Sequence, residues 1–237
     1  MLTTEIKLGK VDSTMEAAKA RAASQDFILI SAEEQTNGRG TRGRAWKSVP
    51  GNIYMTIGIN RRHLPPRRLA LLPLEIGIHL REEAAGSAAS EYRAHLRLKW
   101  PNDLLLRGAK TAGILMESYR EFILIGIGIN VAGAPPVADG GSPAACLADA
   151  GMPPESKAAL VEGIYRRVRE AFERPEDYEP ESILLQWQAK VDWNRRHRLR
   201  DRPGKPHVLP LGVNVHGHLQ VEHADGRREW LVSEYLA

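Results

Sequence analysis

The chain has 237 residues, of which 43% are hydrophobic and 26% are charged, and its formal net charge is +4. This length and composition are those of an ordinary globular protein with one substantial core, or of a larger domain with a small one appended. No apolar run reaches eighteen residues and no charged-then-apolar leader follows Met1. We therefore expect neither a membrane span nor a secretory signal, and we expect a cytoplasmic protein.

The number of cysteines and the distribution of basic residues further limit which kinds of protein this can be. The single cysteine, Cys146, excludes an intrachain disulfide and a multi-cysteine zinc site, and we expect it to be a small buried residue. Basic residues cluster at 39–47 and at 193–205. Such clusters favour an anionic partner, and nucleic acid is one candidate, although many charge clusters are only solvated faces. The aromatic residues that a single-strand binder places between its cations are missing here.

The first part of the chain predicts a helix and two strands. Ser13 and Glu16 have the spacing of a capping box, which predicts a helix that begins there. Residues 27–34 and 52–60 are rich in β-branched and aromatic residues and predict strands. The segment between these strands is therefore a strand-to-strand loop. Residues 67–86 follow with helical spacing, and Pro73 is close enough to the start to be tolerated.

The middle of the chain predicts a run of hairpins. Four strands are expected, at residues 95–100, 103–107, 110–118 and 121–131. Tight turns at Pro101-Asn102 and Arg107-Gly108 connect the first three, so these neighbours should be antiparallel. Helices are expected next, at residues 155–173 and 179–191.

The composition changes after residue 192. Short β-like runs are expected at residues 206–215, 217–223 and 228–234, with turns at Gly217 and Asp225-Gly226. We predict an α+β fold in which residues 1–192 form a mixed, largely antiparallel sheet flanked by helices, and residues 193–237 form a small β-barrel. His216 and His218 would share one face of a strand, but no third metal ligand is evident, so surface strand residues are the better interpretation.

The stretch NGRGTRGRAWKS, residues 37–48, has the glycine spacing of a dinucleotide-binding turn. That function also needs a helix opening inside the motif, and Pro50, Gly51 and Asn52 leave no room for one. It needs a carboxylate about twenty residues later as well, and none is present. The alternative is a loop whose glycines, at 38, 40 and 43, take left-handed backbone angles while its arginines grip phosphate. A solvated basic hairpin with no binding role is the other interpretation.

Three further segments carry residue types that suit a binding site. Residues 99–103, KWPND, place a cation, an aromatic ring, a rigid turn, an amide and a carboxylate at a strand end, although a buried Trp before a Pro-Asn turn would look the same. Lys110 begins the strand KTAGILME and could face a pocket beside Gly113, or it could be an exposed strand-end lysine. In IGIGIN, glycines alternate with isoleucines before Asn130, which would let a ligand lie against the sheet or mark only a bulge.

These features, in this order and at these intervals, resemble the biotin protein ligases, the biotin–[acetyl-CoA-carboxylase] ligases of bacteria. The resemblance covers about residues 8–131 closely and the C-terminal barrel loosely. It implies a biotin/lipoate ligase catalytic domain, similar to class II aminoacyl-tRNA synthetases, with an SH3-like barrel. It also implies ATP-dependent biotinylation of a lysine on a biotin carboxyl carrier protein through biotinyl-5'-AMP, with release of pyrophosphate and then AMP, and with Mg²⁺ bridging the phosphates.

The resemblance also implies roles for individual residues. Arg39 would lie between the biotin carboxylate and the phosphate, Lys110 would hold that carboxylate, and Asp103 would accept a proton from the acceptor lysine. The positions expected to bind biotin are Ser13, Thr14, Met15, Gln35, Gly38, Arg39, Gly40, Thr41, Lys110 and Gly113. The positions expected to bind ATP or the adenylate are Arg42, Arg44, Trp46, Lys99, Asn102 and Asn130. No residue is assigned to a metal.

Two residues depart from the family pattern. Thr41 stands where many relatives have a further arginine, and Met15 where an asparagine or glutamine is frequent, so we expect the activated intermediate to leak. Only a few residues precede the first strand, so we expect a monofunctional enzyme without a DNA-binding domain and without a DNA operator. A homodimer is compatible with the sequence.

Other functions remain as alternatives. A lipoate-protein ligase performs the same adenylation in a related architecture, but the GRGTRGR loop is typical of the biotin group. A nucleic-acid-binding protein would show strong salt dependence and would leave KWPND and Lys110 unexplained. A non-catalytic biotin-binding module would have no need of Lys110 and Asp103.

Overall fold

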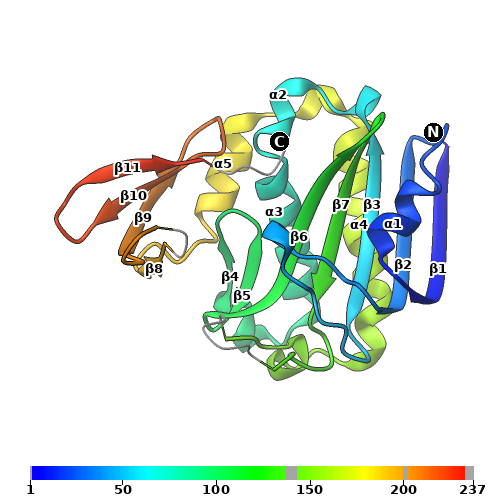
Figure 1. The fold of residues 1–237 in the computed structure, drawn as a ribbon, viewed down its shortest axis with the longest axis horizontal. Helices are drawn as coiled ribbons and strands as arrows, with labels where there is room; N and C mark the ends of the chain where they lie inside the picture. Colours follow the sequence, from blue (N-terminus) through cyan, green and yellow to red (C-terminus); the bar gives the residue numbers. More distant parts are fainter. Residues whose placement is uncertain (1, 137–142, 200–201, 233–237) are drawn as a thin grey trace.

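A computed structural model describes residues 2–136, 143–199 and 202–232 (Figure 1). The fold is α+β, as predicted: a seven-stranded sheet is flanked by helices, and a smaller four-stranded sheet lies beside it. Within the described ranges, no helix is both long enough and apolar enough to cross a bilayer.

The large sheet is mixed and mostly antiparallel, which confirms the prediction. In spatial order its strands are β1 (Thr3–Val11), β2 (Phe27–Gln35), β3 (Ile53–Asn60), β7 (Phe122–Ile129), β6 (Ala109–Tyr119), β5 (Asp103–Leu106) and β4 (Leu96–Lys99). Only β1 and β2 are parallel, because α1 (Thr14–Lys19) crosses over between them. No residue range was predicted above for strand β1, although a first strand was expected within a few residues of the start. It is an edge strand that leaves most side chains exposed, so it lacks a strong apolar pattern.

The two faces of this sheet are covered differently. Helices α3 (Leu72–Ser87), α4 (Lys157–Glu173) and α5 (Pro180–Gln188) belong to the layer behind the sheet in Figure 1, where the main apolar cluster forms. On the other face α1 alone packs against β2 and β7, through Met15 and Ala18. The rest of that face is left for the loop that follows β2.

Residues 67–86 do not form one helix, so that prediction is wrong in its continuity. The structure has α2 (Pro66–Leu69) and then α3, which begins at Leu72. Pro73 lies in the first turn of α3, where its missing N–H costs no helical hydrogen bond. The buried guanidinium of Arg68 on α2 donates to Glu75 on α3 (Nε to Oε2, 2.8 Å) and links the two helices. The other predicted helices are shorter than expected, since α4 begins at Lys157 and α5 ends at Gln188.

The predicted tight turns are present. Trp100-Pro101 is a cis peptide between β4 and β5. Arg107 and Gly108 both have positive φ, 49° and 81°, the conformation of a two-residue hairpin turn between β5 and β6. Short 3-10 helices occur at Thr41–Gly43, Arg61–His63, Ser90–His95, Leu147–Ala150, Pro154–Ser156 and Pro175–Asp177.

The C-terminal region forms an antiparallel sheet in the order β11 (Arg228–Leu231), β10 (Leu219–His223), β9 (His207–Val213) and β8 (His197–Arg198). The last three strands of the chain lie within the expected β-like runs, but His216 and His218 lie in the turn between β9 and β10 and not on a strand as expected. Closure into an SH3-like barrel and a domain boundary near residue 192 stay predictions. Val208, Val213, Leu219 and Val221 belong to the same apolar cluster as α3 and the large sheet, so the two sheets share one core.

Candidate active site

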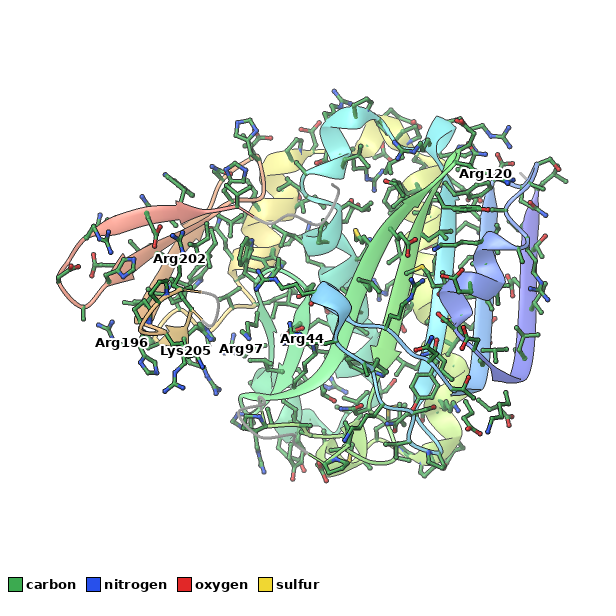
Figure 2. All side chains as sticks on the ribbon, in the orientation of Figure 1. Arg44, Arg97, Arg120, Arg196, Arg202 and Lys205 are labelled. Atoms are coloured by element: carbon green, nitrogen blue, oxygen red, sulfur yellow. The ribbon has the colours of Figure 1, made fainter. Side chains whose placement is uncertain are left out.

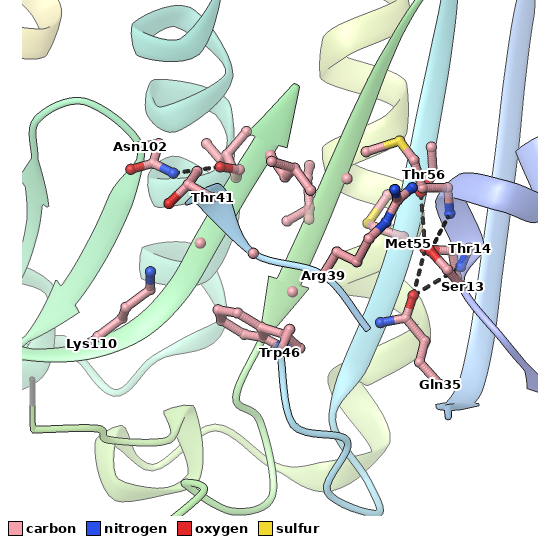
Figure 3. A pocket seen from close by; sticks show the side chains of 18 residues that line it. Ser13, Thr14, Gln35, Arg39, Thr41, Trp46, Met55, Thr56, Asn102 and Lys110 are labelled. Carbon is pink, nitrogen blue, oxygen red and sulfur yellow. Dashed lines mark hydrogen bonds between the residues drawn. The ribbon is translucent and has the colours of Figure 1, made fainter. Parts of the chain in front are cut away.

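A pocket of about 500 Å³, counted with its open mouth, lies on the α1 face of the large sheet. The loop at residues 37–48 covers it, and β3, β6 and β7 form its floor (Figure 3). Residues from the predicted site that line it are Ser13, Thr14, Met15, Gln35, Arg39, Gly40, Thr41, Trp46, Asn102, Lys110 and Gly113. Predicted residues that are not part of its lining are Gly38, Arg42, Arg44, Lys99, Asp103 and Asn130.

One end of the pocket is a hydrogen-bonded polar group at the start of α1. The Thr14 backbone N–H and hydroxyl both donate to Gln35 Oε1, at 2.8 and 3.1 Å. Thr56 on β3, which is fully buried, donates to the Thr14 hydroxyl at 2.9 Å (Figure 3). Ser13 is the N-cap of α1 and accepts from the Met15 N–H. This end presents several fixed donors and acceptors and suits a compact polar group.

Thr56 was missed by the sequence reasoning, and the capping-box prediction is half right. A polar residue in the apolar strand IYMTIGIN was the available signal for Thr56. Ser13 caps the helix as expected, but the Glu16 carboxylate bonds to Lys19 and Arg39.

Glycines make the floor of the pocket, but side chains of the chain itself lie against them. A Cβ on Gly128 would lie 2.4 Å from the Trp46 ring, and one on Gly126 would lie 3.0 Å from Met15 Cε. The alternation in IGIGIN therefore makes room for Trp46 and Met15 against the sheet. The indole N–H of Trp46 is buried and has no hydrogen-bond partner within the described part of the chain.

The other end of the pocket is cationic. Lys110 Nζ lies 2.5 Å from Asp103 Oδ1 and 5.4 Å from the centroid of the Trp46 ring. Lys99 Nζ lies 3.7 Å from the second carboxylate oxygen of Asp103. Lys110 faces the pocket, whereas Lys99 and Asp103 stand behind it. The buried amide of Asn102 donates to the Ile114 carbonyl at 2.5 Å and ties the β4–β5 turn to β6.

Two buried asparagines fix backbone segments near the pocket: Asn130 holds the backbone at Lys110, and Asn52 holds the residues that follow Asn130. The Asn130 amide donates to the carbonyls of Ala145 and Lys110, at 3.2 and 3.4 Å. Asn52 Oδ1 accepts from the backbone N–H of Val131 at 2.9 Å, and also from the next two N–H groups. Asn130 thus lies below the pocket lining. Asn52 was missed because, in sequence, it is simply the last residue of the segment PGN.

The backbone of the loop at residues 37–48 differs from the prediction that all three motif glycines take left-handed angles. Only Gly43 of the three motif glycines has a left-handed φ, 71°, and the neighbouring left-handed residue is Arg42, at 60°. Gly40 is extended, with φ −113°. Gly38 is needed for a close approach, because a Cβ there would lie 2.5 Å from the Trp46 carbonyl oxygen. The motif glycines therefore serve mainly to bring the loop back onto itself.

The Arg39 guanidinium points away from Lys110, toward α1 (Figure 3). It pairs with Glu16 on α1 and with Glu117 on β6, the second at 3.4 Å. Lys19 bonds to the same two carboxylates. Burial disfavours the charged form of Lys19, but its hydrogen bonds to Glu117 and Glu16 outweigh this effect and raise its pKa. The hydrogen bond from Lys19, helped by Arg39, lowers the pKa of Glu16.

The remaining loop arginines are turned outward. The Arg44 guanidinium donates to the Thr41 carbonyl and hydroxyl, at 3.3 and 3.2 Å, so Arg44 supports Thr41. Arg42 and Arg44 are exposed. The two basic clusters lie over different elements, since Arg44 is beside the large sheet while Arg196, Arg202 and Lys205 are beside the small one (Figure 2). The nucleic-acid hypothesis stays untested by this arrangement.

Metal ligands and the cysteine give little further information about the chemistry of this site. The described residues hold no group of three or more His, Cys, Asp or Glu side chains that could bind a metal ion. Cys146 is buried, as expected, and burial raises the pKa of its thiol.

Comparisons with known proteins identify the family of this chain. The model of the biotin/lipoate A/B protein ligase family matches residues 9–132. The chain is 31% identical to a biotin–[acetyl-CoA-carboxylase] ligase of Mycobacterium tuberculosis, over 87% of this chain and 77% of the relative. It is 38% identical to the ligase of the same name from Paracoccus denitrificans, over 54% of this chain and 55% of the relative.

Solved structures show the same fold. The biotin protein ligase of Leishmania major in complex with biotinyl-5-AMP has a TM-score of 0.70 at 29% identity, covering 97% of this chain and 99% of that one. The ligase of Aquifex aeolicus in complex with biotin and ATP has a TM-score of 0.81 at 24% identity, covering 98% and 97%. The matched segment contains the loop, KWPND, Lys110 and GIGIN, and so this chain belongs to the biotin/lipoate A/B protein ligase family, as an enzyme of the biotin protein ligase type.

Proposed function

We propose that this chain joins biotin to a lysine of a biotin carboxyl carrier protein, using ATP and passing through biotinyl-5'-AMP. The observation that carries the proposal is a single pocket with a fixed polar end at Thr14 and Gln35 and a cation, Lys110, at the other. A ligand with a compact polar ring and a distant carboxylate fits that arrangement. The relatives named above are biotin ligases, which supports this choice of ligand.

The first half-reaction joins two anions. Lys110 would hold the biotin carboxylate, so that one of its oxygens attacks the α-phosphorus of ATP and pyrophosphate leaves. The cation lowers the barrier because it offsets the repulsion between carboxylate and phosphate and stabilises the charge of the transition state. Arg39 would contribute after it exchanges its carboxylate partners, Glu16 and Glu117, for phosphate. Mg²⁺ would arrive bound to the ATP phosphates as part of that substrate.

The second half-reaction transfers the acyl group. The carrier lysine must be a neutral amine to attack the mixed anhydride, and Asp103 would accept its proton. The amine forms an amide bond, the bond from the carbonyl carbon to the phosphate oxygen breaks, and AMP leaves. Asp103 is suited to this role because it pairs with Lys110, which lines the pocket, and its side chain keeps 14% of its surface exposed.

The direct test is modification of an isolated carrier domain. The chain, biotin, magnesium ATP and the domain are incubated, and the domain is weighed by mass spectrometry. We expect one biotin on one lysine, and none on a carrier whose acceptor lysine is replaced by arginine. The matched family also contains lipoate ligases, so lipoate is the second substrate to offer. Modification by lipoate alone would overturn the proposal.

A further inference from the structure

Trp100 connects the β4–β5 hairpin, which carries Asn102 and Asp103, to the C-terminal sheet. Its indole N–H donates to the carbonyl of Gly217 at 2.9 Å, across 117 residues of sequence. Trp100 lies in the segment 99–103, next to Asn102 and Asp103, and Gly217 lies in the turn between β9 and β10. No role is assigned to this turn by the function proposed above.

The turn at residues 214–218 is built to present that carbonyl. Asn214 Oδ1 accepts from the backbone N–H groups of His216 and His218, both at 3.0 Å, and the Gly217 N–H donates to the Asn214 carbonyl at 2.9 Å. Gly217 has φ +74°, and a Cβ on it would lie 2.4 Å from the carbonyl oxygen of Ala70. The turn is therefore seated between Trp100 and the junction of α2 and α3, and only glycine fits there.

The hairpin needs such support because it lies at the border of its sheet. Strand β4 is the last of the seven. On its open side, within the described residues, it pairs only with the segment that leads to the small sheet, at Leu98 and Val191. The hairpin must nevertheless hold Asn102 against Ile114 and Asp103 against Lys110. A site residue keeps its geometry only when neighbouring groups lock it, and edge elements open most easily.

We propose that the turn at residues 214–218 is part of the active-site support: by holding Trp100, it sets where Asp103 stands relative to Lys110. Trp100, Asn214 and Gly217 are positioning residues and touch no substrate. The C-terminal sheet thereby contributes to the chemistry without lining the pocket. This inference rests on the proposed function for the reaction that it serves.

The test compares two tryptophans that make the same kind of bond. Trp100→Phe keeps an aromatic ring but removes the donor to Gly217. Trp193→Phe removes an equivalent donor, since Trp193 bonds to the Gln188 carbonyl at 2.8 Å, at the end of α5 and not in the turn at residues 214–218. We expect both variants to lose melting temperature to a similar extent. We expect only Trp100→Phe to lower kcat for carrier modification, by about fivefold, with KM for biotin unchanged.

A second variant reaches the same contact from the other side. Asn214→Ala removes the acceptor that shapes the turn and leaves Trp100 intact. It should reproduce the kcat loss of Trp100→Phe, and the double variant should lose little more, because both changes break one connection. Additive losses in the double variant would overturn the inference, and so would equal kcat losses in Trp100→Phe and Trp193→Phe.

A readout independent of ligase activity separates this inference from the proposed function. Lys110 is acetylated with a small amine-reactive ester at fixed pH, and its labelling rate is followed by mass spectrometry. We expect faster labelling in Trp100→Phe and Asn214→Ala than in the native chain, because Asp103 no longer covers the ammonium as well, and no change in Trp193→Phe. If the native chain modified no carrier, the proposed function would fail while this comparison still decided the inference. Identical labelling rates in all four proteins would refute it.

Discussion

Lys110 on β6 and Asp103 on β5 form an ion pair of 2.5 Å, and their side chains are 29% and 14% exposed. The cation that faces the pocket is thus already shared with a carboxylate. In the proposed mechanism an incoming anion competes with Asp103 for Lys110, and Asp103 becomes available as a base when it loses that competition. The proposed half-reactions would then be coupled through this pair of side chains.

Asp103→Asn should separate the half-reactions. It removes the negative charge beside Lys110, so adenylation, measured as biotin-dependent pyrophosphate exchange, should stay within about threefold of the native rate. Transfer to the carrier should fall roughly a hundredfold, because the base is gone. Asp192→Asn, a change at an exposed carboxylate, is the control for both rates. Equal loss in the two half-reactions would show that Asp103 does not act as the base.

Glu117→Gln should make Arg39 easier to recruit. Arg39 is held by two carboxylates, and partly exposed ion pairs of this kind contribute up to about 1 kcal/mol. Loss of one carboxylate should therefore lower KM for ATP by about two- to fivefold. Glu34→Gln removes an exposed carboxylate that pairs with Lys10 at 2.7 Å on β1 and β2, and it should leave KM unchanged. A raised KM for ATP in Glu117→Gln would contradict this expectation and would mean that Glu117 helps the loop at residues 37–48 to close over the ligand.

Thr41→Arg should reduce leakage of the activated intermediate. Thr41 lines the pocket and offers a hydroxyl where a guanidinium would add a charge-assisted bond to phosphate. Such a bond is worth about 1.5 kcal/mol, so non-specific biotinylation of a bystander protein should drop about tenfold. Lysines of serum albumin, probed with labelled avidin, give the measurement. Unchanged labelling of the bystander protein would show that Thr41 does not cause the activated intermediate to leak.

Parts of this site followed from local sequence, and parts did not. The hairpin turns and the loop between β2 and β3 could be predicted because Pro, Gly and alternating apolar residues act over a few positions. The pairing of Arg39 with Glu117 could not, since it joins residues 78 apart and depends on how the loop folds back. Trp100 was predicted to end a strand before the Pro101-Asn102 turn, while its bond to Gly217 depends on the packing of two sheets. The break between α2 and α3 was missed because the apolar spacing continues across Ala70 and Leu71.

Acid should destabilise the fold through His79. Burial of this ring on α3, with the guanidinium groups of Arg167 and Arg68 nearby, lowers its pKa to about 4. The unfolded chain takes up the proton near pH 6.5 and the folded chain does not, so unfolding becomes easier as pH falls from about 6.5 to 4. The free energy of unfolding should fall on the order of 2 kcal/mol over that window. His197, whose pKa burial also lowers to about 4, acts in the same direction.

His79→Gln should flatten this dependence in part, and His216→Gln, at an exposed ring, should not. Urea unfolding of the native chain and both variants at pH 7, 6, 5 and 4.5 gives the comparison. An unchanged slope in His79→Gln would assign the acid sensitivity to other groups.

Pyrophosphate release from ATP shows whether the chain activates biotin and whether Lys110 takes part. The native chain and Lys110→Ala are each given magnesium ATP with biotin, with lipoate, and with neither. We expect release that requires biotin and that falls roughly a hundredfold in Lys110→Ala, because the cation that holds the carboxylate is missing. Release that requires lipoate instead, or release that persists in Lys110→Ala at the native rate, would contradict it.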